Sequence, residues 1–223
     1  LAANDHDGAR RRFEEALRVA RETGDGRLEA GCHRGLGLIA AALGNHAEAV
    51  SEHRIARDLF TAAGDRAFAG ASGQSLGTAL YWLGDRERAR EAWEATLEDY
   101  EAVDDRAQQA STFYNLAFVA ADPDRKRTLL DRGFALAHES GNRPLEGQLI
   151  AARSDLAFTR GDYRTAFDEV LRGIAVLADA GQAGRKGLAH AYTSLGRLYR
   201  AHAQFDAAIA AYARAMEIGR DTG

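Results

Sequence analysis

The side chains of this 223-residue chain best suited to acid–base or metal chemistry are its seven histidines. A zinc site on a helix needs two histidines four residues apart beside a glutamate, or a cluster of histidine, cysteine and acidic residues. No histidines here have that arrangement, although His46 and His53 can share one helix face. We interpret the whole set as solvated or interhelical residues: His6, His33, His46, His53, His138, His190 and His202.

Two glycine-rich runs invite comparison with phosphate-binding loops. They are residues 31–37 (Gly-x3-Gly-x-Gly) and residues 70–77 (Gly-x2-Gly-x3-Gly). A phosphate loop follows a β-strand and carries a lysine after its glycines, and neither run has these neighbours. Their glycines are therefore predicted to lie where helices touch. The segment 181–187 offers donors for an anion, but not in the order of a nucleotide-binding loop.

The rest of the sequence contains no arrangement typical of a catalytic site. It has no nucleophile elbow, zinc-protease motif or calcium loop. Acidic pairs such as Glu14/Glu15 fall where exposed helix faces are expected. Cys32 is the only cysteine, so neither an internal disulfide nor a thiolate metal site can form. We predict a buried structural thiol, no metal, no cofactor and no enzyme activity.

Charge and hydropathy exclude other classes. The net charge of −4 comes from interspersed residues without a basic block, which argues against nucleic-acid binding by this segment. Apolar stretches end well before the roughly 18 residues of a membrane span. The single cysteine and the lack of a signal-peptide pattern favour the cytoplasm, and the scarcity of lysine suggests a bacterial source. The chain does not begin with Met, so we expect a segment of a longer protein.

Turn-forming residues recur evenly and divide the chain into repeats of about 40 residues. Examples are Gly24-Asp25, Gly64-Asp65 and Asp104-Asp105. A second set, such as Leu43-Gly44-Asn45 and Leu83-Gly84-Asp85, lies between them. The segments between turns have about 16–18 residues, which suits helices and is too long for ordinary strands.

The predicted fold is therefore all-α, with one helix at about 5–23 followed by five antiparallel helix pairs. Pro144 falls in the first turn of a predicted helix, where its missing N–H does no harm, and Pro123 is placed in a turn. The first helices are predicted at about 27–43, 67–83, 107–121, 144–160 and 186–201. The second helices are predicted at about 46–63, 86–103, 124–140, 163–179 and 205–220.

Both helices of the repeat carry a recurring motif. First helices place a large apolar residue before a small one, as in Leu36-Gly37 and Leu76-Gly77. Glycine inside a helix costs about 1 kcal/mol relative to alanine, so its recurrence indicates a packing contact. Second helices place small and aromatic residues on one face, as in Ala208/Tyr212/Ala215.

These motifs resemble the tetratricopeptide repeat over essentially the whole chain. The longer period is similar to that of LGN/Pins, kinesin light chains and the C-terminal arrays of bacterial signal-transduction ATPases and transcriptional regulators. The resemblance implies a tetratricopeptide-like α-solenoid, a right-handed superhelix of about five and a half repeats, in one domain over 1–223. The expected boundaries are 1–24 (a half repeat), 25–64, 65–104, 105–141, 142–182 and 183–223.

Two repeats depart from the pattern. Repeat three has lost about three residues around 122–124, and Lys126 occupies an expected small position. In repeat four, Arg153-Ser154 replaces the Leu-Gly pair. We expect these repeats to pack less regularly.

The resemblance also implies a concave groove lined by the first helices. Its residues lie three before, one after and four after the small position. Its middle is aromatic and its C-terminal end basic, and such residues commonly anchor interfaces; alternatively, some of these aromatics belong to the core between repeats. The implied groove residues are Arg34, Leu38, Ala41, Gln74, Thr78, Tyr81, Tyr114, Phe118, Ala121, Ala151, Asp155, Phe158, Thr193, Arg197 and Arg200, with His190 nearby.

We therefore predict a scaffold for protein–protein interaction that binds a peptide or partner segment in this groove. The partner would carry an apolar anchor followed by acidic groups, and it can be another domain of the same polypeptide. Ends without polar capping helices leave self-association open. The alternative is a ligand- or peptide-sensing domain of a bacterial transcriptional or signalling regulator.

Overall fold

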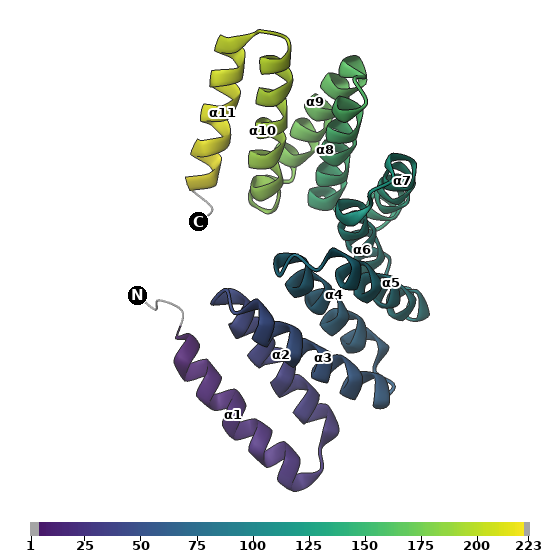
Figure 1. Ribbon diagram of the computed structural model, residues 1–223, viewed down its shortest axis with the longest axis vertical. Helices are drawn as coiled ribbons and strands as arrows, with labels where there is room; N and C mark the ends of the chain where they lie inside the picture. The colour runs from purple at the N-terminus through teal and green to yellow at the C-terminus, as the bar shows by residue number, and fades with distance from the viewer. Residues whose placement is uncertain (1–4, 221–223) are drawn as a thin grey trace. The chain divides into compact units, whose positions relative to one another are not determined.

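Helices form nearly all of the structure, a computed structural model that describes residues 5–220. This range contains eleven α-helices, one short 3-10 helix and no strand (Figure 1). The α-helices are α1 (His6–Thr23), α2 (Gly26–Ala42), α3 (His46–Ala62), α4 (Arg66–Trp82), α5 (Arg86–Ala102), α6 (Arg106–Val119), α7 (Pro123–Glu139), α8 (Arg143–Thr159), α9 (Tyr163–Asp179), α10 (Arg185–Ala201) and α11 (Phe205–Arg220). The all-α prediction is confirmed, and each predicted helix ends close to its expected position.

Both residues of each recurring Gly-Asp turn have a structural role. Gly24, Gly64 and Gly84 have φ values of +70°, +71° and +84°, a left-handed conformation that glycine adopts without steric cost. The aspartate that follows begins the next helix: Oδ1 of Asp25 accepts a hydrogen bond from the backbone N–H of Leu28 at 2.9 Å. Such a bond satisfies one of the free N–H groups at a helix start. The dipeptide thus ends one helix and caps the next.

Two turns differ from the prediction. Pro123 is the first residue of α7 rather than part of the preceding turn, because its fixed φ and missing N–H suit the start of a helix. Asp122 caps this helix by accepting a hydrogen bond from the N–H of Arg125 at 2.7 Å. Residues Gly181–Gly184, which lie between the predicted helices 163–179 and 186–201, form the 3-10 helix η1 before α10.

The chain divides into two compact units, residues 1–105 and 106–223. The first unit contains α1 to α5 and the second contains α6 to α11. Within each unit every helix packs against the next one along the chain (Figure 1). The assignment of residues 1–223 to one repeat domain stays a prediction.

The small residues of the first helices lie at close helix contacts, as predicted. A Cβ atom added to Gly77 would lie 2.4 Å from Nε1 of Trp93 on α5, and one added to Gly196 would lie 2.6 Å from the Tyr212 ring on α11. Ser154 occupies this position in repeat four. Its hydroxyl is buried and donates a hydrogen bond to the carbonyl oxygen of Ala166 at 2.7 Å. A small polar residue therefore fits here when it finds a partner across the contact.

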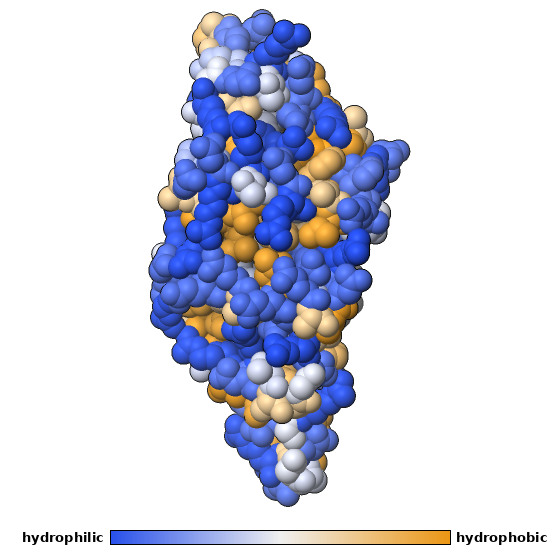
Figure 2. Space-filling model, turned by 90° about the vertical axis from the view of Figure 1, so that its right-hand side faces the viewer, coloured by the Kyte–Doolittle hydropathy of each residue, from blue (hydrophilic) through white to orange (hydrophobic). Residues whose placement is uncertain are grey.

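Polar residues predominate on the face seen in Figure 2, and apolar residues form separate patches on it. None of the helices within residues 5–220 is long and apolar enough to cross a membrane. The same range contains no group of three or more His, Cys, Asp or Glu side chains arranged to hold a metal ion.

Candidate binding surfaces on the first helices

In the first unit, a hollow of about 220 Å³ lies on the surface of α2, α3 and α4. Four of its lining residues are groove positions that the resemblance implied: Leu38 and Ala41 on α2, and Gln74 and Thr78 on α4. The structure thus brings together predicted positions from two successive repeats. We call this feature the unit-1 hollow; its other lining residues are His46, His53, Ser75, Ala79 and Trp82.

Two large apolar side chains stand exposed beside the unit-1 hollow. Trp82 is 65% exposed and Leu38 is 45% exposed. The Trp82 ring stacks on that of His46, with centroids 6.2 Å apart, and meets the ring of Tyr81 edge-on at 5.7 Å. An aromatic residue of this size can bury about 150–250 Å² in a contact, so the rim of the hollow offers apolar area to a partner.

His53 forms part of the lining and is only 1% exposed. Burial, followed by the positive charge of Arg34, lowers the pKa of His53 to about 4, because both effects disfavour the protonated ring. The imidazole is therefore neutral near pH 7. Nδ1 of His53 is buried without a hydrogen-bond partner among the described residues. The lining contains no acidic residue, lysine or arginine, and the buried His53 is neutral.

Two other predicted groove residues of this unit pack beside neighbours. The guanidinium of Arg34 lies 5.8 Å from the ring centroid of Phe68, a cation–π arrangement. Tyr81 lies against Trp93 as well as Trp82, with its ring 6.2 Å from that of Trp93. Both side chains remain partly exposed at the edge of the surface.

In the second unit, the predicted residues gather around Asp155 on α8. Arg197 on α10 donates a short hydrogen bond to Oδ1 of Asp155, and Nε2 of His190 lies 3.2 Å from Oδ2. The Arg197 guanidinium also lies 5.7 Å from the ring centroid of Phe158. We call Asp155, Phe158, His190 and Arg197 the Asp155 cluster. Four predicted groove residues from two repeats thus contact one another, and His190 and Arg197 remain partly exposed to solvent.

The electrostatics of the Asp155 cluster alter the expected charge of the groove. Burial raises the pKa of Asp155, but the hydrogen bond with His190 and the charge of Arg197 outweigh it and hold the pKa below its usual value. The carboxylate is therefore ionised and balances the charge of Arg197. Of the basic end that the sequence suggested, only Arg200 is exposed and without an ion pair to any described residue. This reduces the attraction expected for acidic groups of a partner.

The aromatic residues of α6 pack on each other. The rings of Tyr114 and Phe118 meet edge-on at 4.9 Å, and Phe118 is 43% exposed. Burial, and then the negative charge of Asp155, raise the pKa of Tyr114 to about 12, so its hydroxyl stays neutral. A hollow beside Phe118 measures only about 30 Å³. It is much smaller than the unit-1 hollow of about 220 Å³.

The sequence missed some residues and misplaced one. Ala151 was implied as groove-facing but is fully buried, since it packs in the core of α8 to α11. Thr193 and Ala121 are exposed, as expected. Trp82 and His46 were not identified as site residues. The signal for Trp82 was an aromatic residue one position beyond the last groove position of its helix.

The comparisons with known proteins agree with the repeat fold. A family model described as a tetratricopeptide repeat matches residues 71–103 and 188–222. The chain contains tetratricopeptide repeats. These two matches fall on α4–α5 and α10–α11, whose first helices carry Leu76-Gly77 and Leu195-Gly196. No curated protein matches the chain.

Solved structures of low sequence identity share the fold of this tetratricopeptide array. BtubC (BKLC) from P. vanneervenii is 17% identical, with a TM-score of 0.77, and the match covers 98% of this chain and 92% of that one. The apo form of RapI is 10% identical, with a TM-score of 0.74 and coverage of 99% and 94%. The signal transduction ATPase PH0952 from Pyrococcus horikoshii, described as having a tetratricopeptide repeat sensor, is 15% identical, with a TM-score of 0.68 and coverage of 91% and 31%. At these identities the likeness concerns the fold alone.

Proposed function

We propose that this tetratricopeptide array is a protein-interaction scaffold, not an enzyme, and that the unit-1 hollow receives an apolar side chain of a partner segment. The observation that carries the proposal is the exposure of Trp82 and Leu38 on the rim of a hollow that is lined by no acidic residue, lysine or arginine. Exposed tryptophan at the edge of a small concavity is typical of residues that dominate binding energy. The partner can belong to another protein or to the same polypeptide.

The chemistry of the hollow defines the anchor that it suits. A Leu, Met or Phe side chain would cover apolar area on Trp82, while the polar groups of Thr78 and Gln74 could meet the backbone of the segment. Neutral His53 offers one unmatched ring nitrogen at the lining, where a charged group would be left without a counterion. We therefore expect a neutral apolar anchor rather than a charged one.

The test is to select binding peptides by display on the purified chain and measure their dissociation constants with two variants. Trp82→Ala should weaken binding by about 2 kcal/mol or more, roughly 30-fold in Kd. Ile55→Ala is the control, because Ile55 is also an exposed apolar residue but lies on the other side of α3 from His53. Equal affinities for Trp82→Ala and the parent would overturn the proposal.

The second candidate function is a sensor that binds a small ligand or short peptide and signals to an effector domain. It is supported by the likeness to the ATPase whose array is described as a sensor. In either case we place the protein in the bacterial cytoplasm, consistent with its one buried cysteine. Native mass spectrometry of the purified chain separates the two functions. A copurified small molecule would favour the sensor, and its absence together with peptide binding would favour the scaffold.

A further inference from the structure

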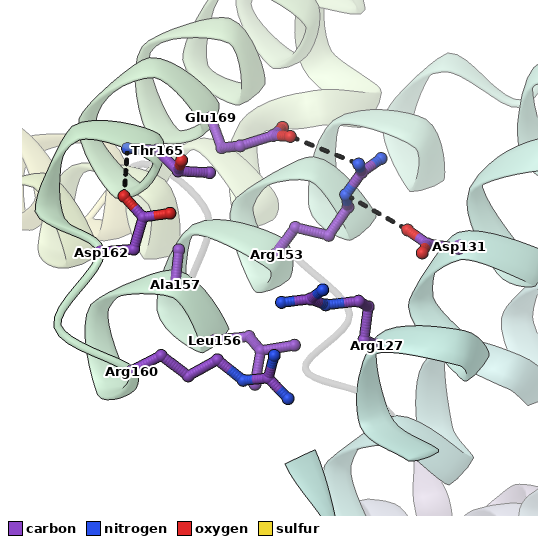
Figure 3. Close-up of a pocket in the computed structure, with 9 residues that line it drawn as sticks. All are labelled: Arg127, Asp131, Arg153, Leu156, Ala157, Arg160, Asp162, Thr165 and Glu169. Carbon is purple, nitrogen blue, oxygen red and sulfur yellow. Dashed lines mark hydrogen bonds and ion pairs between the residues drawn. The ribbon is translucent and has the colours of Figure 1, made fainter. Parts of the chain in front are cut away.

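Another concavity, of about 400 Å³, lies between α7, α8 and α9 in the second unit (Figure 3). Successive residues of an α-helix are about 100° apart, so Arg153 in this pocket and Asp155 on the first-helix surface face opposite sides of α8. The pocket is therefore separate from the surfaces described above. We call it the arginine pocket, because Arg127, Arg153 and Arg160 all contribute to its walls.

The arginine pocket coincides with the one repeat that lacks the leucine of the Leu-Gly pair. At this position the other four repeats carry buried leucines: Leu36, Leu76, Leu116 and Leu195. Repeat four has Arg153 instead, and its side chain is 29% exposed within the pocket. A charged group at a core position loses hydration and lowers stability. The exchange therefore indicates a role other than packing.

Arg153 is held from three sides. Its guanidinium lies 3.5 Å from Oδ1 of Asp131 on α7 and 3.4 Å from Oε1 of Glu169 on α9, the two ion pairs drawn in Figure 3. It also lies 5.4 Å from the ring centroid of Phe134. These contacts balance its charge and fix it as part of the wall. Ligand binding is thus left to the other charged groups.

Arg127 and one carboxylate oxygen of Glu169 have no direct hydrogen-bond or ion-pair partner in the pocket. Arg127 points into the pocket (Figure 3) and forms no ion pair or hydrogen bond within residues 5–220. Oε2 of Glu169 is buried and has no hydrogen-bond partner in the same range. Arg160 pairs at 2.5 Å with Asp124, whose side chain is 84% exposed, so a ligand could displace Asp124. Buried polar atoms without partners are uncommon in folded proteins.

Asp162, one of the acidic residues of the pocket, is ionised at neutral pH. Asp162 begins α9, and its Oδ1 accepts a hydrogen bond from the N–H of Thr165 at 3.1 Å. Hydrogen bonds from the Thr165 side chain and backbone lower the pKa of Asp162. Asp162 and Glu169 lie on the α9 side of the pocket, while Arg127 and Arg160 lie on the α7 and α8 sides.

We propose that the arginine pocket binds a small zwitterion, a free amino acid or dipeptide. Its carboxylate would lie against Arg127 and Arg160, and its ammonium group against Glu169 and Asp162. The three arginines of the lining are balanced by Asp131, Asp162 and Glu169, so an isolated phosphate meets no net attraction. A molecule with both charges can pair with Arg127 and with the free oxygen of Glu169. The volume is within the usual range of small-ligand sites, about 300–1,000 Å³.

The test uses the whole chain and does not depend on the unit-1 hollow. Each standard amino acid and its glycyl dipeptide is titrated by calorimetry and by NMR shifts to millimolar concentration. The best binder is then compared with its N-acetylated form, its C-amidated form and inorganic phosphate. We expect each blocked form to bind at least about 10-fold more weakly, because each has lost one charged contact.

Matched variants locate the site. Arg127→Gln should weaken the zwitterion at least about 10-fold without changing the melting temperature, because Arg127 has no ion pair to lose. Glu169→Gln should abolish the preference for the free amine over the acetylated form. Arg54→Gln, an exposed arginine on α3, is the control and should bind normally.

Three outcomes would overturn the proposal. They are no binding by any amino acid or dipeptide, equal binding of free and blocked forms, and tighter binding of phosphate than of the zwitterion. The last would show a plain anion site. Any of these would leave the role of Trp82 untouched, since that role is measured on display-selected peptides in another unit.

Discussion

The first-helix surfaces of the two units use the same repeat positions but differ in openness. In the first unit they border a hollow of about 220 Å³ with Trp82 exposed on its rim. In the second unit the hollow beside Phe118 measures about 30 Å³, and Asp155 pairs with His190 and Arg197.

The residue that follows the small position accounts for much of this difference. In the first unit this residue is Leu38 in one repeat and Thr78 in the next. In the last two repeats of the second unit it is Asp155 and Arg197. Asp155 and Arg197 have opposite charges and reach each other across adjacent helices. Thr78 is short, and its hydroxyl donates to the Gln74 carbonyl oxygen of its own helix at 3.0 Å. Pairing between neighbouring repeats thus fills a groove that uncharged residues leave open.

The largest expected effect is a loss of folding stability in acid, which His53 of the first unit causes. Because the folded pKa of His53 is about 4 and the unfolded value is about 6.5, the unfolded chain binds the additional proton between these pH values. Stability is full above pH 6.5 and falls as pH drops toward 4, by roughly 3 kcal/mol at most. Urea titrations across this range should show the loss in the parent and a much smaller slope in His53→Gln. Identical slopes would mean that His53 is not buried in its neutral form.

The next effect tests the close contact between α4 and α5 in the first unit. Gly77→Leu would place a side chain where even a Cβ lies 2.4 Å from Nε1 of Trp93. Overpacking of this kind costs about 1–3 kcal/mol, so the melting temperature should fall. Gly31→Ala is the control, since nothing lies within 4 Å of its added Cβ, and alanine in a helix should stabilise by up to about 1 kcal/mol. A stable Gly77→Leu variant would contradict the contact between α4 and α5.

The smallest effect concerns the Asp155 cluster. Asp155→Asn should lower stability at neutral pH by about 1 kcal/mol, because the ion pair with Arg197 is partly exposed. The folded pKa of Asp155 is lowered, so its contribution is present above the unfolded pKa of about 3.9 and disappears as pH falls through the lower folded value. The parent and the variant should therefore converge below about pH 4. A double-mutant cycle with Arg197→Ala measures the coupling, and additive effects would show that the pair is not formed.

Acid should thus act on the two surfaces at different pH. The first unit responds through His53 between pH 6.5 and about 4, whereas Asp155 responds only below about pH 4. Residue-resolved hydrogen exchange can follow each unit separately. Simultaneous loss of protection at one pH would contradict this difference.

The local features of the repeat were readable from the sequence because they depend on neighbours in the chain. Gly24-Asp25 marks a helix end and the next cap through contacts a few residues long. The Leu-Gly pairs and the helical period predicted which faces meet. The resemblance placed Leu38, Ala41, Gln74 and Thr78 on one groove, and the structure brings them together.

The tertiary structure alone decided the contacts between residues that lie far apart in the chain. Arg197 was predicted as a free basic group, but Asp155, 42 residues earlier, neutralises it. Trp82 lies beside a hollow that residues of α2, α3 and α4 form together. The sequence marked Arg153 as a departure, and only packing of α7, α8 and α9 placed Arg127 and Glu169 beside it. Periodicity specifies which face of a helix a side chain occupies, whereas charge pairing and cavity shape depend on distances between helices.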